Sequence, residues 1–239
     1  MSAFTITMQQ LATRVYRILG ILPAGGAPTA DQFTQAVLAF NLLSLEQQAT
    51  GPSQFRLQQL SLAIPIGVAY SGSPYVITPP VAQVIDARWV VNPAPNLYER
   101  QMGRFAYEDY MTLPNKLSAT QSGPSVWCFD KQSAASNLYL WPLPANGGTL
   151  NLTVSRYVNP VANPSDLLDF PYEWQEGLVY ATADRLMDDE GVAAADQVTA
   201  DRIHEKAQAF TRLLEDYDRP ASVFFRPYGS AGNGRFWRG

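Results

Sequence analysis

The fold of the N-terminal part of the chain is decided by residues 7–52, TMQQLATRVYRILGILPAGGAPTADQFTQAVLAFNLLSLEQQATGP. Its first half carries apolar residues three, four and seven positions apart, at Met8, Leu11, Val15, Ile18, Leu19 and Leu22. This is the period of a helix with one buried face. Thr7 and Gln10 also have the spacing of a capping box, in which each side chain accepts a hydrogen bond from the backbone N–H of the other residue. The pattern predicts a helix that begins after Thr7.

A second helix is predicted after the turn at residues 23–28, PAGGAP, which ends the first one. Thr29 and Gln32 repeat the capping box. One face of this helix carries Phe33, Val37, Phe40 and Leu43 or Ser44, and beside that face lie Leu38, Leu42 and Leu45. Gly51-Pro52 ends the helix, so residues 1–52 are predicted to form a helical hairpin.

The period changes in residues 53–163, where short apolar runs are separated by Pro, Gly, Asn and Ser. The predicted strands are 60–64, 75–78, 84–91, 126–130, 138–141 and 150–154, and 107–112 is predicted as one helical turn. Asn146-Gly147-Gly148 is a hairpin signal between two of these strands. Strands at such spacing with turns between them indicate an inserted β-sandwich or barrel-like domain.

Residues 164–217 return to the helical period, and two more helices are predicted there. Pro171 suits the first position of one helix, and Gly191 suits the residue after its last turn. The other helix starts between Val192 and Thr199 and runs to about Tyr217. The simplest packing is a four-helix bundle built from both chain ends, which makes the fold class α+β. Its predicted core is Leu11, Val15, Ile18, Phe33, Val37, Phe40, Trp174, Leu178, Ile203, Phe210 and Leu214.

The last segment, residues 218–239, is predicted to be an extended arm, because two prolines and four glycines prevent a regular element. Four arginines and one aspartate give it a side-chain charge of +3. Arginines and aromatic residues are typical anchors of interfaces. They are Arg219, Phe224, Phe225, Arg226, Tyr228, Arg235, Phe236, Trp237 and Arg238. Nucleic-acid stacking and a frayed end are alternatives, but docking to a protein partner is favoured because free aromatic residues are a liability.

Composition excludes several classes of protein. Only 16% of the 239 residues are charged, below the usual fraction, and the net charge of −4 offers no overall basic footprint for nucleic acid. The single cysteine, Cys128, excludes an internal disulfide framework. We expect no signal peptide, because the N-terminus lacks the required pattern. No apolar run is long enough for a membrane span, so we expect no membrane association.

Catalytic signals are weak throughout the sequence. His204 is the only histidine, so no cysteine and histidine metal cluster can form, and it is read as a solvated helix position. Glu173 with Glu176, and the run 188–190, are read as solvated carboxylates rather than as a glycosidase pair. No phosphate-binding glycine frame is present, and Cys128 is read as a structural thiol. We expect no catalytic, metal or cofactor-binding residues and no enzymatic activity.

Three groups of segments, which cover most of the chain, resemble a known family. They are 18–22, 27–30 and 36–43 near the N-terminus; 113–116, 123–124 and 140–144 in the β section; and 168–174 with 178–186 in the third helix. Together they resemble the head-to-tail adaptor, or connector, proteins of short-tailed bacteriophages, also called packaged-DNA stabilisation proteins or tail accessory factors. The sequence departs from that pattern at residues 187–191, MDDEG, where an end rich in Ala and Pro is more usual.

The resemblance implies a subunit of a closed ring of about twelve identical copies beneath the portal protein. The helical parts would pack side by side, and the β section would face distal tail proteins, a nozzle or hub and fibres. The arm would reach the portal, and genomic DNA would pass through the channel without sequence-specific binding. The location implied is the tail or neck of the virion, after assembly in the host bacterial cytoplasm.

Two other functions stay open at this stage. A carbohydrate- or receptor-binding tail module would use aromatic residues of the β section, namely Tyr98, Tyr107, Tyr110, Trp127 and Trp141. The helices at both chain ends argue against it, because a binding sandwich needs no such helices. A hydrolase built on Glu173 is the third hypothesis.

Overall fold

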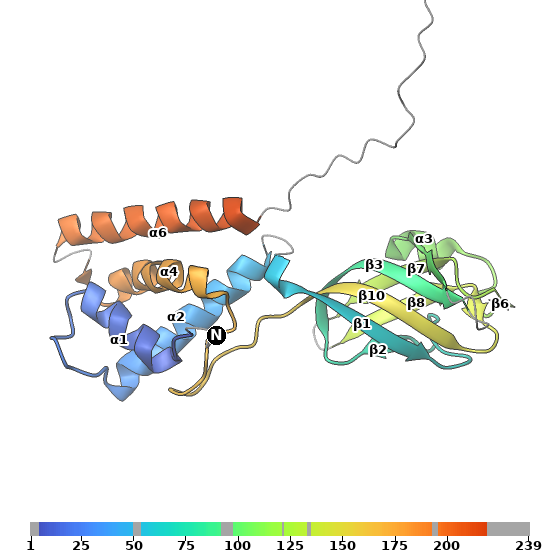
Figure 1. The fold of residues 1–239 in the computed structure, drawn as a ribbon, viewed down its shortest axis with the longest axis horizontal. Helices are drawn as coiled ribbons and strands as arrows, with labels where there is room; N and C mark the ends of the chain where they lie inside the picture. Colours follow the sequence, from blue (N-terminus) through green and yellow to red (C-terminus); the bar gives the residue numbers. More distant parts are fainter. Residues whose placement is uncertain are drawn as a thin grey trace, which may run out of the picture.

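The computed structural model describes residues 5–49, 54–91, 98–120, 122–132, 135–192 and 196–218. Helices gather at one end of the molecule and strands at the other (Figure 1). The helical part contains α1 (Met8–Ile18), α2 (Ala30–Ala49), α4 (Gln175–Asp189) and α6 (Gln197–Asp218), with η2 (Tyr172–Trp174) leading into α4. The mixed α and β character is therefore confirmed.

Local hydrogen bonds explain why the first two helices begin where they do. The Gln10 backbone N–H donates to Thr7 Oγ1 at 3.3 Å, and the Thr7 N–H donates to Gln10 Oε1 at 2.9 Å. The same pair of bonds joins Thr29 and Gln32. Each box satisfies backbone N–H groups that a helix end otherwise leaves without partners. Both predicted capping boxes are confirmed.

Helices from the two ends of the chain share one hydrophobic core. α4 contacts α1, α2 and α6, and α1 contacts α2. Met8 and Leu11 of α1, Phe40 of α2 and Leu178 of α4 are buried in the same cluster. A chain return from the strands, residues 157–168, also packs here, because Val158 and Val161 belong to that cluster.

The strands form two four-stranded sheets. One has the order β1 (Leu57–Ile64), β10 (Gly148–Arg156), β3 (Val81–Val91) and β4 (Tyr98–Gln101), all antiparallel. The other has the order β2 (Tyr75–Ile77), β8 (Ser136–Trp141), β7 (Val126–Lys131) and β5 (Gly103–Arg104), with only β5 parallel to its neighbour.

Three short elements complete the description of this half. They are η1 (Gln54–Arg56), α3 (Tyr107–Thr112) and a parallel pair, β6 (Ala119–Thr120) with β9 (Leu143–Pro144). Side chains from both large sheets, among them Trp89, Leu152, Trp127 and Leu140, share one buried cluster. Neither large sheet closes on itself in the described residues, so the barrel-like alternative is wrong.

Two local expectations need correction. The turn at Asn146-Gly147-Gly148 does not connect a hairpin, because the preceding β8 and β9 and the following β10 lie in different sheets. β10 instead pairs with β1 and β3, which places Leu150 and Leu152 in the core. Pro171 does not open α4 either. It caps η2 in an extended conformation, and α4 starts four residues later, at Gln175.

Candidate interaction surfaces

One side of α2 is apolar and exposed. Leu38, Leu42 and Leu45 are 54%, 49% and 58% exposed, whereas Ala36, Phe40 and Leu43 on the other side of the same helix are buried. These three leucines are three and four positions apart, so they form one row along the helix. We call this row the leucine ridge. A helix that is apolar on both sides normally has neighbours on both. The described part of the chain covers only one of them.

A shallow groove of about 210 Å³ runs along one flank of the leucine ridge. Leu38 and Leu42 line it together with Leu186 and Asp189 of α4. Arg185 also lines it and forms an ion pair with Glu46 of α2. The leucine ridge is thus an apolar row bordered by charged side chains, a composition common at protein interfaces.

A larger groove of about 580 Å³ lies between α1 and the start of α4. We call it the α1–α4 groove. Its lining includes Ile6, Thr13, Arg14, Arg17 and Val179. Arg14 crosses it to form an ion pair with Glu176, at 3.0 Å between Nη2 and Oε1. Tyr172, also in the lining, is 63% exposed. The lining of the α1–α4 groove is therefore mostly polar, with Ile6, Tyr172 and Val179 as its apolar members.

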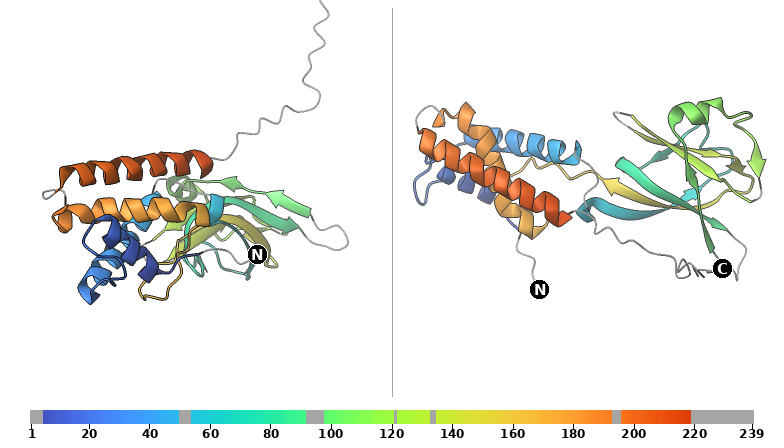
Figure 2. Two further views of the ribbon diagram at one scale, coloured as in Figure 1. Left: turned by 60° about the vertical axis from the view of Figure 1, so that its left-hand side comes forward. Right: turned by 90° about the horizontal axis from the view of Figure 1, so that it is seen from above.

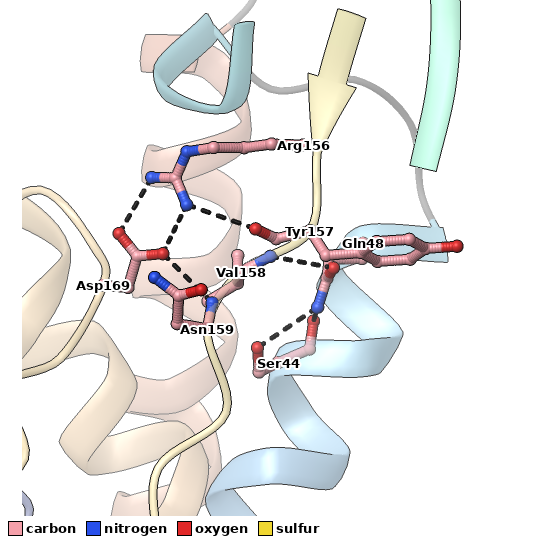
Figure 3. A network of polar contacts seen from close by, with 7 residues as sticks. All are labelled: Ser44, Gln48, Arg156, Tyr157, Val158, Asn159 and Asp169. Atoms are coloured by element: carbon pink, nitrogen blue, oxygen red, sulfur yellow. Dashed lines mark hydrogen bonds and ion pairs between the residues drawn. The ribbon is translucent and has the colours of Figure 1, made fainter. Parts of the chain in front are cut away.

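The two halves of the molecule meet at a polar joint, which Figure 3 shows from close by. Arg156, the last residue of β10, forms an ion pair with Asp169, and its Nη2 lies 2.8 Å from Asp169 Oδ1. Asp169 Oδ2 also accepts the Asn159 backbone N–H at 3.0 Å. The Val158 N–H donates to Gln48 Oε1 at 3.1 Å, which ties the same segment to α2.

The environment of Asp169 favours its charged form. Burial by itself would raise the pKa of the carboxyl group. The hydrogen bonds from Arg156 and the Asn159 N–H, together with the arginine charge, outweigh burial and hold the pKa below its usual value.

Nearby, the Asn41 side chain makes two hydrogen bonds with the backbone of Val161, at 2.9 and 3.1 Å. No pattern in the sequence marks any of these joint contacts.

The predicted core residues of the helical part are found in these places. Leu11, Val15, Phe40, Trp174, Leu178 and Ile203 are buried in the helical core cluster, and Ile18, Phe33 and Val37 pack against it partly buried. Phe210 is half-buried and stacks on Tyr180, with 5.8 Å between ring centroids. The side chain of Leu214 lies outside the described part of the structure, as does the whole predicted docking arm from Arg219 onward.

The groups considered for catalysis have other partners. His204 is exposed and contacts Asp184, with 2.9 Å between Nδ1 and Oδ1. Cys128 is buried, and burial raises the pKa of its thiol to about 11, which disfavours the nucleophilic thiolate. Among the described residues, no group of three or more His, Cys, Asp or Glu side chains is arranged to hold a metal ion. No described helix has the length and hydropathy needed to cross a membrane.

The aromatic residues considered for carbohydrate binding are divided between core and surface. Tyr110 and Trp127 are buried, and Trp141 is half-buried. Only Tyr98 and Tyr107 are exposed. Because sugar rings stack on accessible aromatic faces, three of the five side chains are poorly placed for that role.

Comparison with known proteins gives one family. The family model described as SU10 adaptor protein matches residues 6–227, which includes both halves of the molecule and the start of the arm. No curated protein matches the chain significantly. The leucine ridge, an exposed apolar surface without a partner in the described chain, agrees with a protein that joins others. The chain belongs to the SU10 adaptor protein family and is a phage adaptor protein.

Proposed function

We propose that the chain is a subunit of a ring that lies beneath the portal protein, joins the capsid to the tail, and helps retain and pass the genomic DNA. The observation that carries this proposal is the leucine ridge. Its three leucines are about half exposed on a helix whose other side is core. Burying them against a second subunit would remove apolar surface from water, which stabilises the contact by about 25 cal/mol for each Å² buried.

The division of labour within the subunit is also part of the proposal. Residues 1–52 and 164–217 form one helical unit that packs against neighbouring subunits, and residues 53–163 form a β unit directed toward distal tail proteins. The arm, residues 218–239, anchors to the portal through its aromatic residues, with Arg219, Arg226, Arg235 and Arg238 adding directed contacts to carboxylates.

The role is structural and consists of binding rather than catalysis. The net charge of −4 suits a DNA conduit, because a basic channel would hold the duplex instead of letting it pass. The ring would contain about twelve copies of the chain. Its location would be the neck of the virion, after assembly in the host bacterial cytoplasm.

Imaging of the full chain mixed with the portal ring of its phage tests this function most directly. We expect closed rings of the chain seated on one face of the portal. The chain alone is expected to sediment largely as a monomer, if the arm must order on the portal before neighbours associate. A chain that leaves portal rings bare at high micromolar concentration would contradict the proposal.

Deletion of residues 218–239 is expected to abolish portal binding and leave the helical and β parts folded. The reason is that the arm contributes five aromatic residues and four arginines but no residue of the described cores. Co-sedimentation with the portal measures binding, and circular dichroism measures folding. Substitution of the four arginines by lysine keeps the charge and the aromatic residues of the arm, so it is expected to weaken portal binding without abolishing it. Normal assembly by the truncated chain would refute the arm's role.

A further inference from the structure

The strand β1 has one edge without a neighbouring strand in the described part of the chain. It is the last strand of its sheet, and it pairs with β10 over eight consecutive residue pairs without a bulge. The four long helices do not cover this edge, because they lie at one end of the molecule and β1 leads away from them (Figure 1 and Figure 2). The unpaired N–H and C=O groups of such an edge can pair with another extended chain.

β1 also lacks the features that normally protect an edge strand. Proteins protect such strands by keeping them short, or with charged residues, prolines or bulges. β1 has eight residues, LQQLSLAI, and none of them is charged or a proline. Among the described residues, the other edge strands are protected: β2 and β5 have three and two residues, and β4 carries Glu99 and Arg100. The β1 edge is therefore the place where these sheets can accept another strand.

The core side of β1 indicates which strand would fit. Leu60 and Leu62 pack against the core between the two sheets but stay partly exposed. Their partners on β10, Leu152 and Leu150, are 1% and 0% exposed. The difference arises because β10 has a strand on each side and β1 has one on a single side. Apolar residues on an added strand, opposite Leu60 and Leu62, would complete their burial.

The outer side of β1 sets a different requirement. Gln59 and Ser61 are exposed there, and they line a shallow groove of about 360 Å³ together with Asn151 and Thr153 of β10. Successive residues of a strand point to opposite faces of the sheet. The strand that fits this edge therefore alternates apolar residues on the core side with polar residues on the outer side.

We propose that the free edge of β1 binds an extended segment of a distal tail protein, which joins the four-stranded sheet as a fifth strand. This inference rests on the proposed function and identifies the surface through which the β unit holds the tail. A second copy of this chain fits less well, because its other described edges are short or charged. Pairing of two β1 edges would use up both, so it stops at two copies and cannot continue around a ring.

Amide hydrogen exchange tests the proposal on three samples: the free chain, the ring bound to the portal, and the complete tail. We expect the β1 amides to exchange at least tenfold more slowly in the complete tail than in the other two samples, because new backbone hydrogen bonds form only there. The amides of β4, at the opposite edge of the same sheet, are the control and should exchange equally in the ring and the complete tail.

The outcomes separate this inference from the proposed function. Protection of β1 that is already present in the portal-bound ring would show that a neighbouring copy covers the edge, and it would overturn the choice of partner. Rings and complete tails that form without protection of β1 would overturn the strand addition and leave the ring intact. Absence of rings would remove both proposals.

Ser61→Lys gives a second measurement, because a lysine on an edge strand discourages the addition of another strand. The variant should bind the portal normally and attach distal tail proteins at least tenfold more weakly, as measured by co-sedimentation with portal-bound rings. Gln101→Lys is the matched control. The register places Ser61 and Gln101 in one row across the outer face, exposed at opposite edges of the sheet. Equal attachment by the two variants, with both folded by circular dichroism, would contradict the role of the β1 edge.

Discussion

Replacing Gly123 with alanine is expected to lower the free energy of unfolding of the β part by about 2–5 kcal/mol. Gly123 has a φ of +76°, a conformation that costs an L-residue about 1–2 kcal/mol. A Cβ atom there would also lie 2.2 Å from Nε1 of Trp89. Trp89 is buried between the two sheets and has little room to move.

The backbone at Gly123 cannot easily retreat. Arg100 Nη2 donates hydrogen bonds to the carbonyls of Ser122, Gly123 and Pro124, at 2.9, 3.1 and 2.8 Å. Both sides of the clash are therefore held in place. Overpacking of this kind adds about 1–3 kcal/mol to the cost of the backbone conformation.

Gly67→Ala is the matched control for this prediction. Gly67 has a φ of +75°, and no atom lies within 4 Å of a Cβ placed there. Its substitution should cost only the conformational term, about 1–2 kcal/mol. Urea denaturation followed by circular dichroism gives both values. Equal losses in the two variants would mean that Trp89 yields and that the close approach is not a constraint.

Local chemistry explains which parts of the fold could be predicted from sequence. Capping boxes and apolar periods depend on residues within one element, so the starts of α1 and α2 were predictable. The strand runs were found for the same reason: inward positions such as Leu150 and Leu152 alternate along β10. Short strands without alternation, such as β5 and β6, left no such signal.

Pairing between elements was not predictable in the same way. Alternation shows which residues point inward but not which sheet a strand joins, and for this reason the hairpin predicted at the turn before β10 is wrong. The leucine ridge presented a similar problem. The period of α2 predicts Leu43 on the buried face and Leu38, Leu42 and Leu45 beside that face, as observed, but it does not show what covers those three leucines. The hydrogen bond between Gln48 and Val158 joins residues 110 positions apart, and neither residue type indicates such a contact in the sequence.

Substitution of Asp169 by alanine is expected to loosen the joint between the two halves and to cost about 2–3 kcal/mol of stability at neutral pH. Breaking a fully buried pair costs about 3–5 kcal/mol, and the value is lower here because the side chains of Arg156 and Asp169 keep 29% and 24% of their exposure. The variant leaves the Arg156 guanidinium without its carboxylate and the Asn159 N–H without an acceptor. Asp188→Ala, at an exposed acid of α4, is the control and should change stability by less than about 0.5 kcal/mol.

The pH dependence of stability separates the charge of Asp169 from its packing. The pKa of Asp169 in the folded chain is below its usual value, so in acid the unfolded chain binds more protons than the folded chain does. The stabilisation is fully present above the unfolded pKa of about 3.9 and is lost as the pH falls through the lower folded pKa. The wild type should therefore lose more stability than Asp169→Ala between about pH 5 and about pH 3. Denaturation midpoints measured across this range for both chains give the comparison. Asp166 and Asp196 also have lowered pKa values, but they contribute equally to the pH dependence of both chains. Parallel curves for the wild type and Asp169→Ala would therefore show that the charge of Asp169 contributes nothing to the joint.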